Sequence, residues 1–375
     1  MIKTISFIKK LNRKRIHITR KAKNYFYITY YKILSKNKIS YPKEEISKCR
    51  TIAILLPRKG IGDLIVTSGL ISQLRKNNYK VYCLINQNLQ FLFNELITTD
   101  GIEILDKKYS FKQIVSKNLY FDIIMDPADP DKNLYQRIGY ITAIKHKYAI
   151  GFNQNLASSF FDINEIRNEI NTHYSDRLIS FARILNININ NFKYDLYISN
   201  NTIDKIKSFI SNKLNNKKFI IFNPIASDIN RSLSLKTIRE TLLFLQEQTN
   251  KVIITYNVKD TNLINDFPEI IFNPFSSLID CIALIKYASL VISTDTCFVH
   301  AANFFNSKMI CIYNNRLDGN KYCNNDYWGP NYKNAIQIFS KENLHTETGD
   351  NLQKLSVDVI KKAFDQYKIL EEEHI

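Results

Sequence analysis

The sequence lacks the cysteine and histidine spacings that hold zinc or form a redox-active disulfide, although it contains six residues of each type. No C-x-x-C pair and no H-E-x-x-H motif occurs, so we predict no metal site. Several cysteines lie in segments that favour strands or helices, where a free thiol behaves as a small apolar side chain. These absences predict a protein without disulfides in a reducing cytosol.

The N-terminal head, residues 1–48, lacks a long apolar run. No uninterrupted apolar segment or small-residue cleavage site follows its charges, so it is not expected to be a secretory signal. Its longest uncharged run, Asn24 to Tyr31, is far shorter than the ~20 residues of a membrane-spanning helix.

Positive charge is concentrated in this head. The chain has a formal charge of +17, and residues 1–48 contain 14 Lys and Arg against two Glu, which leaves about +5 for the rest. Lys and Arg alternate with Phe, Tyr and Ile, a pattern typical of a helix on an anionic membrane surface. Nucleic-acid binding uses the same residue types, and a partly disordered basic tail is a third possibility. We favour the membrane surface.

The rest of the chain predicts two α/β domains. Its 375 residues exceed one ordinary core, and short apolar runs alternate with helical patterns in two blocks. We expect strands at 51–56, 80–85, 121–125, 219–224, 252–257, 269–274, 290–293 and 308–314, and helices at 64–75, 87–96, 235–248, 278–288 and 298–305. The expected divisions are a basic aromatic extension (1–48), two doubly wound Rossmann-like domains that face a cleft (49–200 and 201–350) and a C-terminal helix (351–375).

The loop Gly60-Ile61-Gly62-Asp63 follows the first expected strand and opens a helix. A dinucleotide fingerprint would need glycine where Ile65 stands, and a phosphate-binding P-loop would need Gly-Lys-Ser/Thr. Both are missing, which disfavours nicotinamide and P-loop chemistry. On its position alone, Asp63 is most simply a helix N-cap.

A second strand-to-helix turn contains Thr294-Asp295-Thr296, followed by a helix that bears His300. Asp295 and Thr296 can cap this helix, and its N-terminal N–H groups suit a diphosphate. His300, one turn further on, can add a donor. Taken alone, however, Asp295 is again a cap and His300 a half-buried core histidine.

Together the two loops resemble glycosyltransferase family nine, the bacterial heptosyltransferases of lipopolysaccharide core synthesis. The family's first loop reads G-x-G-D before an apolar helix, as in Gly60–Leu70, and its last site reads D-[ST]-G-x-x-H-x-A-A, matched by Asp295–Ala302. Weaker similarities occur in order at 147–153, 173–187, 222–234 and 327–330. The resemblance covers about residues 50 to 340 and implies the two-domain GT-B fold.

The resemblance also implies roles for individual residues. Asp63 is expected to be the general base of an inverting transfer, with Arg58, Lys59, Gly60 and Gly62 on the acceptor side. Donor-binding residues are expected to be Arg231, Asp295, Thr296, Cys297, Phe298 and His300. The sequence departs from the family at Cys297, which replaces a glycine, and at 231–234, where Arg-Ser-Leu-Ser replaces Lys-x-Trp-Pro. Both departures bear on the identity of the donor sugar.

We therefore expect a cytoplasmic enzyme, peripheral on the inner face of the bacterial inner membrane. It would move a sugar, heptose from ADP-heptose in the first place, onto the lipopolysaccharide or lipooligosaccharide core. Neither a metal nor another cofactor is expected, and nucleic acid is not an expected partner. The alternatives are another nucleotide sugar on the same fold, or a non-catalytic basic protein that binds nucleic acid or an anionic polymer.

One further motif belongs to a competing interpretation. Asp129-Pro130-Asp131 follows an expected strand, and two carboxylates so spaced can hold a divalent cation on a nucleotide diphosphate, as in metal-dependent GT-A transferases. Acidic, proline-containing stretches after strands are more often turns. The second α/β block also has no place in that interpretation.

Overall fold

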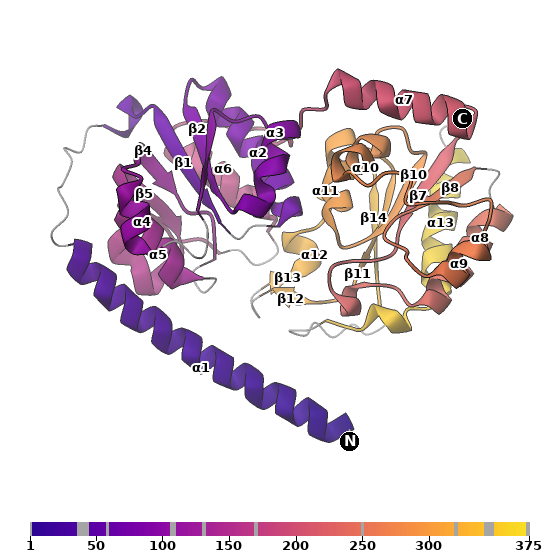
Figure 1. Ribbon diagram of the computed structural model, residues 1–375, viewed down its shortest axis with the longest axis horizontal. Helices are drawn as coiled ribbons and strands as arrows, with labels where there is room; N and C mark the ends of the chain where they lie inside the picture. The colour runs from indigo at the N-terminus through magenta and orange to yellow at the C-terminus, as the bar shows by residue number, and fades with distance from the viewer. Residues whose placement is uncertain are drawn as a thin grey trace.

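The computed structural model describes residues 2–35, 45–57, 60–105, 110–129, 133–168, 172–248, 251–318, 322–340 and 349–372. These residues form two six-stranded sheets with helices around them, side by side, and a long N-terminal helix that runs below the first sheet in Figure 1. No helix among them is long and apolar enough to cross a membrane.

The first sheet has the strand order β3-β2-β1-β4-β5-β6, and all its pairs are parallel. Its strands are β1 (Thr51–Leu56), β2 (Lys80–Ile85), β3 (Gly101–Ile104), β4 (Tyr120–Met125), β5 (Lys145–Phe152) and β6 (Ile163–Glu165). Its helices are α2 (Ile61–Lys76), α3 (Gln90–Glu95), α4 (Phe111–Ser116), α5 (Leu134–Ala143) and α6 (Tyr174–Ile184). Side chains of β1 alternate between two cores, one shared with α2 and α6 and one with α4 and α5, which explains its uninterrupted apolar sequence.

The second sheet has the order β14-β11-β10-β7-β8-β9, again entirely parallel. Its strands are β7 (Phe219–Asn223), β8 (Val252–Thr255), β9 (Ile271–Phe272), β10 (Leu290–Thr294), β11 (Met309–Tyr313) and β14 (Ala335–Phe339). Its helices are α7 (Asn200–Leu214), α8 (Leu235–Gln248), α9 (Thr261–Asn265), α10 (Leu278–Ile285), α11 (Cys297–Phe305) and α13 (Val357–Glu372). A small hairpin of β12 (Leu317–Asp318) and β13 (Tyr322–Cys323) leads into α12 (Asn324–Tyr327).

Both sheets have the same topology, with strands in the sequence-relative order 3-2-1-4-5-6. In each sheet the order in which strands are added reverses between the first and fourth strands, β1 and β4 or β7 and β10, while all strands stay parallel. Ligands of such sheets bind outside the carboxyl ends of the strands at this switch point. The Gly60–Asp63 loop follows β1, and the Asp295–Thr296 turn follows β10, so each predicted site lies at a switch point.

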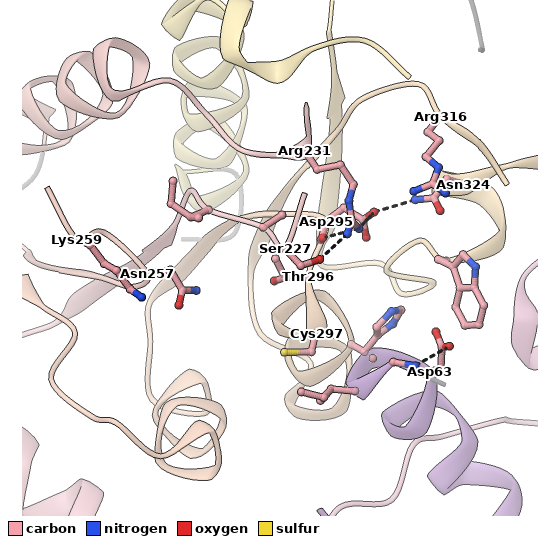
Figure 2. Close-up of a pocket in the computed structure, with 17 residues that line it drawn as sticks. Asp63, Ser227, Arg231, Asn257, Lys259, Asp295, Thr296, Cys297, Arg316 and Asn324 are labelled. Atoms are coloured by element: carbon pink, nitrogen blue, oxygen red, sulfur yellow. Dashed lines mark hydrogen bonds and ion pairs between the residues drawn. The ribbon is translucent and has the colours of Figure 1, made fainter. Parts of the chain in front are cut away.

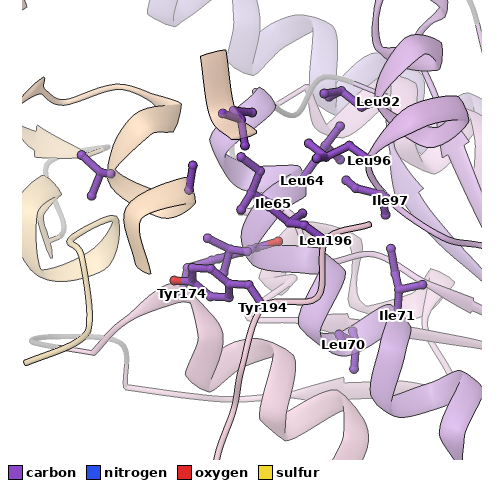
Figure 3. Close-up of a cluster of buried hydrophobic side chains, with 14 of the residues drawn as sticks. Leu64, Ile65, Leu70, Ile71, Leu92, Leu96, Ile97, Tyr174, Tyr194 and Leu196 are labelled. Atoms are coloured by element: carbon purple, nitrogen blue, oxygen red, sulfur yellow. The ribbon is translucent and has the colours of Figure 1, made fainter. Parts of the chain in front are cut away.

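The two domains share a continuous apolar core. Helix α2 packs against α6 and against α11 of the second domain, and one buried cluster runs from β1 through α2 to α11 and β10. Figure 3 shows its part around α2, where Leu64 and Ile65 lie near Tyr174 and Tyr194. The relative position of the domains is therefore fixed by apolar contacts as well as by the covalent connection.

The basic extension is only partly separate from the first domain. Helix α1 (Ile2–Ser35) packs along α5 through one face, on which Asn24, Ile28 and Tyr31 are buried. The expectation that this helix lies on a membrane surface therefore does not hold for Tyr31, which is buried against the first domain. Tyr25 and Phe26 are exposed.

Asparagine is the residue that most often adopts the left-handed backbone conformation in this structure, a conformation that glycine adopts most readily. Twelve described residues other than glycine have φ between +46° and +63°, and every one is asparagine. They include Asn215 and Asn306, the C-caps of α7 and α11. Asn tolerates this left-handed region because its short polar side chain can hydrogen-bond locally.

Candidate active site

A cavity of about 830 Å³ lies between the two switch points. Its volume suits a nucleotide-sized ligand. Figure 2 shows Asp63 at one end of it, on a helix of the first domain, and Asn257 and Lys259 at the other. The lining residues are Gly60, Ile61, Gly62, Asp63, Ile225, Ala226, Ser227, Arg231, Asn257, Lys259, Asp295, Thr296, Cys297, His300, Arg316, Asn324 and Trp328.

Asp63 is the third residue of α2, and its N-cap is Gly60. The interpretation of Asp63 as the N-cap is therefore wrong, because the N-cap lies three residues earlier, at Gly60. The backbone N–H of Gly60 donates to Oδ2 of Asp63 over 3.0 Å, which fixes the carboxylate across the mouth of the helix. The unpaired N–H groups of a helix N-terminus stabilise negative charge at this position.

Gly62 lies where the two domains touch. A Cβ atom at this position would stand 2.7 Å from Cδ2 and 3.2 Å from Nε2 of His300. Glycine is thus required for the N-terminal ends of α2 and α11 to approach each other. The same contact brings Asp63 to the wall of the cavity that α11 forms.

Two side chains of the second domain, one cationic and one neutral, hold the carboxylate of Asp295. Nη1 of Arg231 donates to Oδ2 of Asp295 over 2.9 Å, and the amide of Asn324 donates to the same oxygen over 2.9 Å. Nη2 of Arg231 donates to Ser227 over 2.9 Å. Nε of Arg231 and Nε of Arg316 are buried without a hydrogen-bond partner among the described residues. An anion in this cavity would meet two guanidinium groups with donor capacity to spare.

Thr296, not Asp295, caps helix α11. The hydroxyl of Thr296 accepts from the N–H of Phe298 over 3.3 Å, and the amide of Asn223 donates to the same hydroxyl over 3.0 Å. Asp295 instead orients Arg231, so the sequence-based view of Asp295 as a cap is wrong. The N-terminus of α11 opens on the cavity at Thr296 and Cys297, where a helix favours an anion.

Cys297 and His300 are both uncharged at neutral pH. Burial raises the pKa of the Cys297 thiol to about 12, so no thiolate opposes a bound anion. Burial lowers the pKa of His300 to about 4, so this residue can donate a hydrogen bond but adds no charge. The pKa of His173, at the start of α6, is lowered to about 3 by burial and by the nearby His300.

A smaller cavity of about 130 Å³ adjoins the first on the side of the first domain. Asp63 and Trp328 line both cavities, and Leu55, Pro57, Asp129 and Arg137 line the smaller one. Trp328 belongs to the second domain, so that domain forms part of the wall of this cavity. The ring of Trp328 packs on Tyr174 of the first domain, with ring centroids 4.4 Å apart. A small pocket beside Asp63 is thereby bounded by both domains.

Two ion pairs support the wall of the smaller cavity. Arg137 pairs with Asp126 and both side chains are buried, while Arg177 donates to Asp129 over 2.8 Å. Asp129 was the first carboxylate of the competing metal motif, and Asp131 lies outside the described residues. Within the part of the chain that the structure describes, no three His, Cys, Asp or Glu side chains gather as a metal site.

The structure brings most of the predicted site residues together. Arg231, Asp295, Thr296, Cys297 and His300 line the same cavity as Gly60, Gly62 and Asp63. Phe298 does not line the cavity, because its ring is buried against Tyr256, with the two ring centroids 5.5 Å apart. Arg58 and Lys59 lie outside the described residues.

Sequence reasoning missed several polar residues of the cavity. Asn257 and Lys259 follow β8, and Arg316 and Asn324 flank the β12–β13 hairpin. Trp328 belongs to the Tyr-Trp-Gly-Pro segment at 327–330, which carried a family resemblance but no assigned role. Isolated polar residues after short strands gave no periodic signal for the other four.

Two Rossmann-like domains that enclose a nucleotide-sized cavity, with a carboxylate from one and a helix N-terminus from the other, form the arrangement of the GT-B fold. A model of glycosyltransferase family 9 (heptosyltransferase) matches residues 139–355, and the chain belongs to this family. It is therefore a glycosyltransferase of the kind that acts in lipopolysaccharide synthesis.

A curated relative agrees with this assignment, and two solved structures share the fold. The chain is 27% identical over 354 residues to a protein of Escherichia coli K12 named "Putative lipopolysaccharide heptosyltransferase 4", with 88% of this chain and 96% of that protein covered. The family 9 glycosyltransferase of Veillonella parvula has the same fold, with a TM-score of 0.66, 15% identity and coverage of 85% of this chain and 96% of that one. The structure of E. coli ADP-heptose heptosyltransferase II has a TM-score of 0.62 and 13% identity, and covers 85% of this chain and 99% of that one.

Proposed function

We propose that this enzyme transfers a heptose from ADP-heptose onto the lipopolysaccharide or lipooligosaccharide core with inversion at the anomeric carbon. The observation that carries the proposal is a single cavity with Asp63 at one end and the α11 N-terminus, Arg231 and Arg316 beyond it. Among proteins of the same fold, E. coli WaaC has been solved with ADP, with a TM-score of 0.60 and 14% identity over 84% of this chain and 99% of that one.

In the proposed reaction, an acceptor hydroxyl attacks the anomeric carbon of the donor. Asp63 accepts the hydroxyl proton as the new C–O bond forms and the bond to the diphosphate oxygen breaks. The hydrogen bond from Gly60 to Oδ2 holds the carboxylate in one orientation, which is what a positioned general base requires. A single displacement of this kind forms no covalent sugar–enzyme intermediate.

The departing diphosphate belongs at the N-terminus of α11. Developing negative charge there is met by helix N–H groups and by the guanidinium groups of Arg231 and Arg316, which stabilise a transition state electrostatically. We propose that these groups replace a divalent cation, and that the far end of the cavity, at Asn257 and Lys259, holds the nucleoside.

We further propose that α1 keeps the enzyme at the cytoplasmic face of the inner membrane, where a glycolipid acceptor resides. The support is its charge and exposure. Residues 2–35 contain ten Lys or Arg and no Asp or Glu. Ile18, Phe26 and Ile33 are each at least 59% exposed. Cations with exposed apolar side chains suit an anionic leaflet.

Nucleotide selectivity tests the donor assignment. ADP should raise Tm more than UDP, GDP or CMP in a thermal-shift panel, because the proposed donor carries ADP. A nucleotide present at 100 times its Kd adds about 2.7 kcal/mol to the free energy of unfolding. Arg316→Ala should abolish most of the ADP shift. Arg239→Ala, which removes an exposed cation of α8 that pairs with Asp266, should leave the ADP shift intact. A larger shift with another nucleotide would replace ADP-heptose by the corresponding donor.

Transfer itself is tested with ADP-heptose and lipopolysaccharide that lacks its outer heptoses, by mass spectrometry of the product. A mass increase of one heptose is expected. Turnover with a different nucleotide sugar but not with ADP-heptose would retain the reaction class and reject the proposed donor.

A further inference from the structure

Helix α1 and the first domain enclose an open hollow of about 500 Å³. Its lining from α1 includes Lys23, Tyr27, Tyr30 and Tyr31, and its lining from the domain includes Phe111 and Tyr135. We call this hollow the α1 groove. It is distinct from the cavity that contains Asp295, because the two share no lining residue.

The groove is held in shape by specific contacts. The side-chain oxygen of Asn24 accepts from the backbone N–H of Tyr135 over 3.4 Å, at the first turn of α5, where helix N–H groups need partners. Farther along, a Cβ atom on Gly139 would stand 2.6 Å from the Tyr31 hydroxyl. Gly139 and Asn24 therefore allow α1 to pack directly against α5 at these positions.

Gln136 connects the groove to the reaction site. It lines both the α1 groove and the smaller cavity beside Asp63. Asp63 and Trp328 in turn line the smaller cavity and the donor cavity. Three adjoining hollows therefore extend from the Arg231 region, past Asp63, to the underside of α1.

The chemistry of the groove is aromatic and cationic. The rings of Tyr27 and Tyr135 lie 5.3 Å apart, and Nζ of Lys23 lies 4.5 Å above the Tyr135 ring. Burial raises the pKa of Tyr31 to about 12, so its phenol stays neutral and able to donate. The described lining contains no carboxylate, and Ser110 and Gln136 add polar groups.

Carbohydrate is the ligand class that best fits this lining. The C–H face of a pyranose is apolar and packs on an aromatic ring, while its hydroxyls need donors and acceptors at the rim. An acyl chain would instead favour an enclosed slot without phenol, amide and ammonium groups. The cation at Lys23 further selects a saccharide with an acidic group.

We propose that the α1 groove binds the non-reacting, negatively charged sugars of the acceptor while its reacting hydroxyl lies at Asp63. The inference rests on the proposed transfer to a core saccharide and deepens it. Helix α1 then contributes directly to acceptor recognition through the face that it turns toward the protein.

The test uses the full-length enzyme and deacylated lipopolysaccharide core oligosaccharide, which cannot insert into a membrane. Calorimetric titration measures its Kd, and steady-state kinetics measure its KM. Tyr30→Ala and Lys23→Gln should each raise both constants about three- to tenfold, the effect of one aromatic or charged contact. The donor KM and kcat should not change. Tyr25→Ala is the matched control, since Tyr25 is an exposed tyrosine of the same helix outside the groove.

The outcomes separate this inference from the proposed function. Unchanged oligosaccharide Kd in both groove variants would overturn the α1 groove as a sugar site. Binding only of anionic phospholipid vesicles, lost in Tyr30→Ala, would overturn it in favour of a lipid site. Groove-dependent oligosaccharide binding without any heptose transfer would support the groove and reject the proposed donor or reaction. Gly139→Ala, which should displace the Tyr31 ring without removing any side chain from the lining, provides a second variant that should also raise the oligosaccharide Kd.

Discussion

Replacement of Gly62 by alanine tests whether the contact between α2 and α11 sets the geometry of catalysis. The new Cβ would lie 2.7 Å from Cδ2 of His300, whereas carbon atoms normally approach to about 3.5–4.0 Å. Relief therefore requires a displacement of about 1 Å. His300 is only 4% exposed, so its ring has little room to move and the helices must separate.

We expect Gly62→Ala to lower kcat/KM by about 10²-fold, the typical effect of a 1 Å misplacement of a reacting group. Overpacking should reduce the free energy of unfolding by about 1–3 kcal/mol, which calorimetry would detect as a Tm lowered by a few degrees. The matched control is Gly60→Ala. Its Cβ would meet nothing closer than Asp63 at 4.0 Å, and Gly60 has an extended φ of −78°, so this variant should stay near the wild-type rate.

The double variant Gly62→Ala/His300→Ala isolates the contact itself. Removal of the ring should restore part of the stability lost in Gly62→Ala, a positive coupling between neighbours. Equal kcat/KM for Gly60→Ala and Gly62→Ala, or purely additive effects in the double variant, would refute the reasoning.

Four further predictions follow from the site, the two buried histidines and α1. Asp63→Asn should keep Tm, since its amide oxygen can still accept from Gly60, but lose about 10²–10⁴-fold in kcat; near-normal kcat would leave Asp63 a structural role. Activity should survive excess EDTA, and loss that Mn²⁺ restores would establish a metal requirement. His173 and His300 have pKa values lowered to about 3 and about 4, so the unfolded chain binds more protons below pH 6.5. Stability should therefore fall as pH drops from 6.5 toward 4, by up to about 1.4 kcal/mol per pH unit per histidine, and His300→Gln should flatten Tm against pH. Deletion of residues 2–20 removes seven cations but spares Asn24, Ile28 and Tyr31. It should weaken binding to anionic liposomes, each cation contributing up to about 1 kcal/mol, with the ADP-induced Tm shift unchanged; equal liposome binding would reject the membrane role.

Local sequence patterns predicted the strands that lie at the centre of each sheet. The expected ranges 51–56 and 80–85 coincide with β1 and β2, and 235–248 coincides with α8, because their apolar residues are buried on both faces or on one helical stripe. β3, β5, β6 and β14 were missed. β5 begins with Lys145 and His146, and β3 is only half buried, so neither presents a continuous apolar run.

Contacts between distant segments could not be read from local patterns. The docking of α1 depends on Gly139 in α5, and the role of Gly62 depends on His300 in the other domain. Asp295 was assigned as a cap because its sequence position allows it, but Arg231 and Asn324 compete for its carboxylate. The family resemblance, rather than periodicity, placed Asp63 and the Asp295–Ala302 helix in one site.

The left-handed asparagines limit how this sequence can change over evolutionary time. Any residue with a Cβ atom pays a steric penalty of roughly 1–2 kcal/mol in that region, and Asn and Asp are the side chains that enter it most readily. Twelve such positions in a chain with only nine glycines make asparagine a backbone requirement as well as a compositional preference. At Asn215 and Asn306 the tolerated substitutions are few, glycine foremost. During evolution, asparagines on the surface that lie outside the left-handed region can therefore be replaced freely. The twelve left-handed asparagines should persist or be exchanged for glycine.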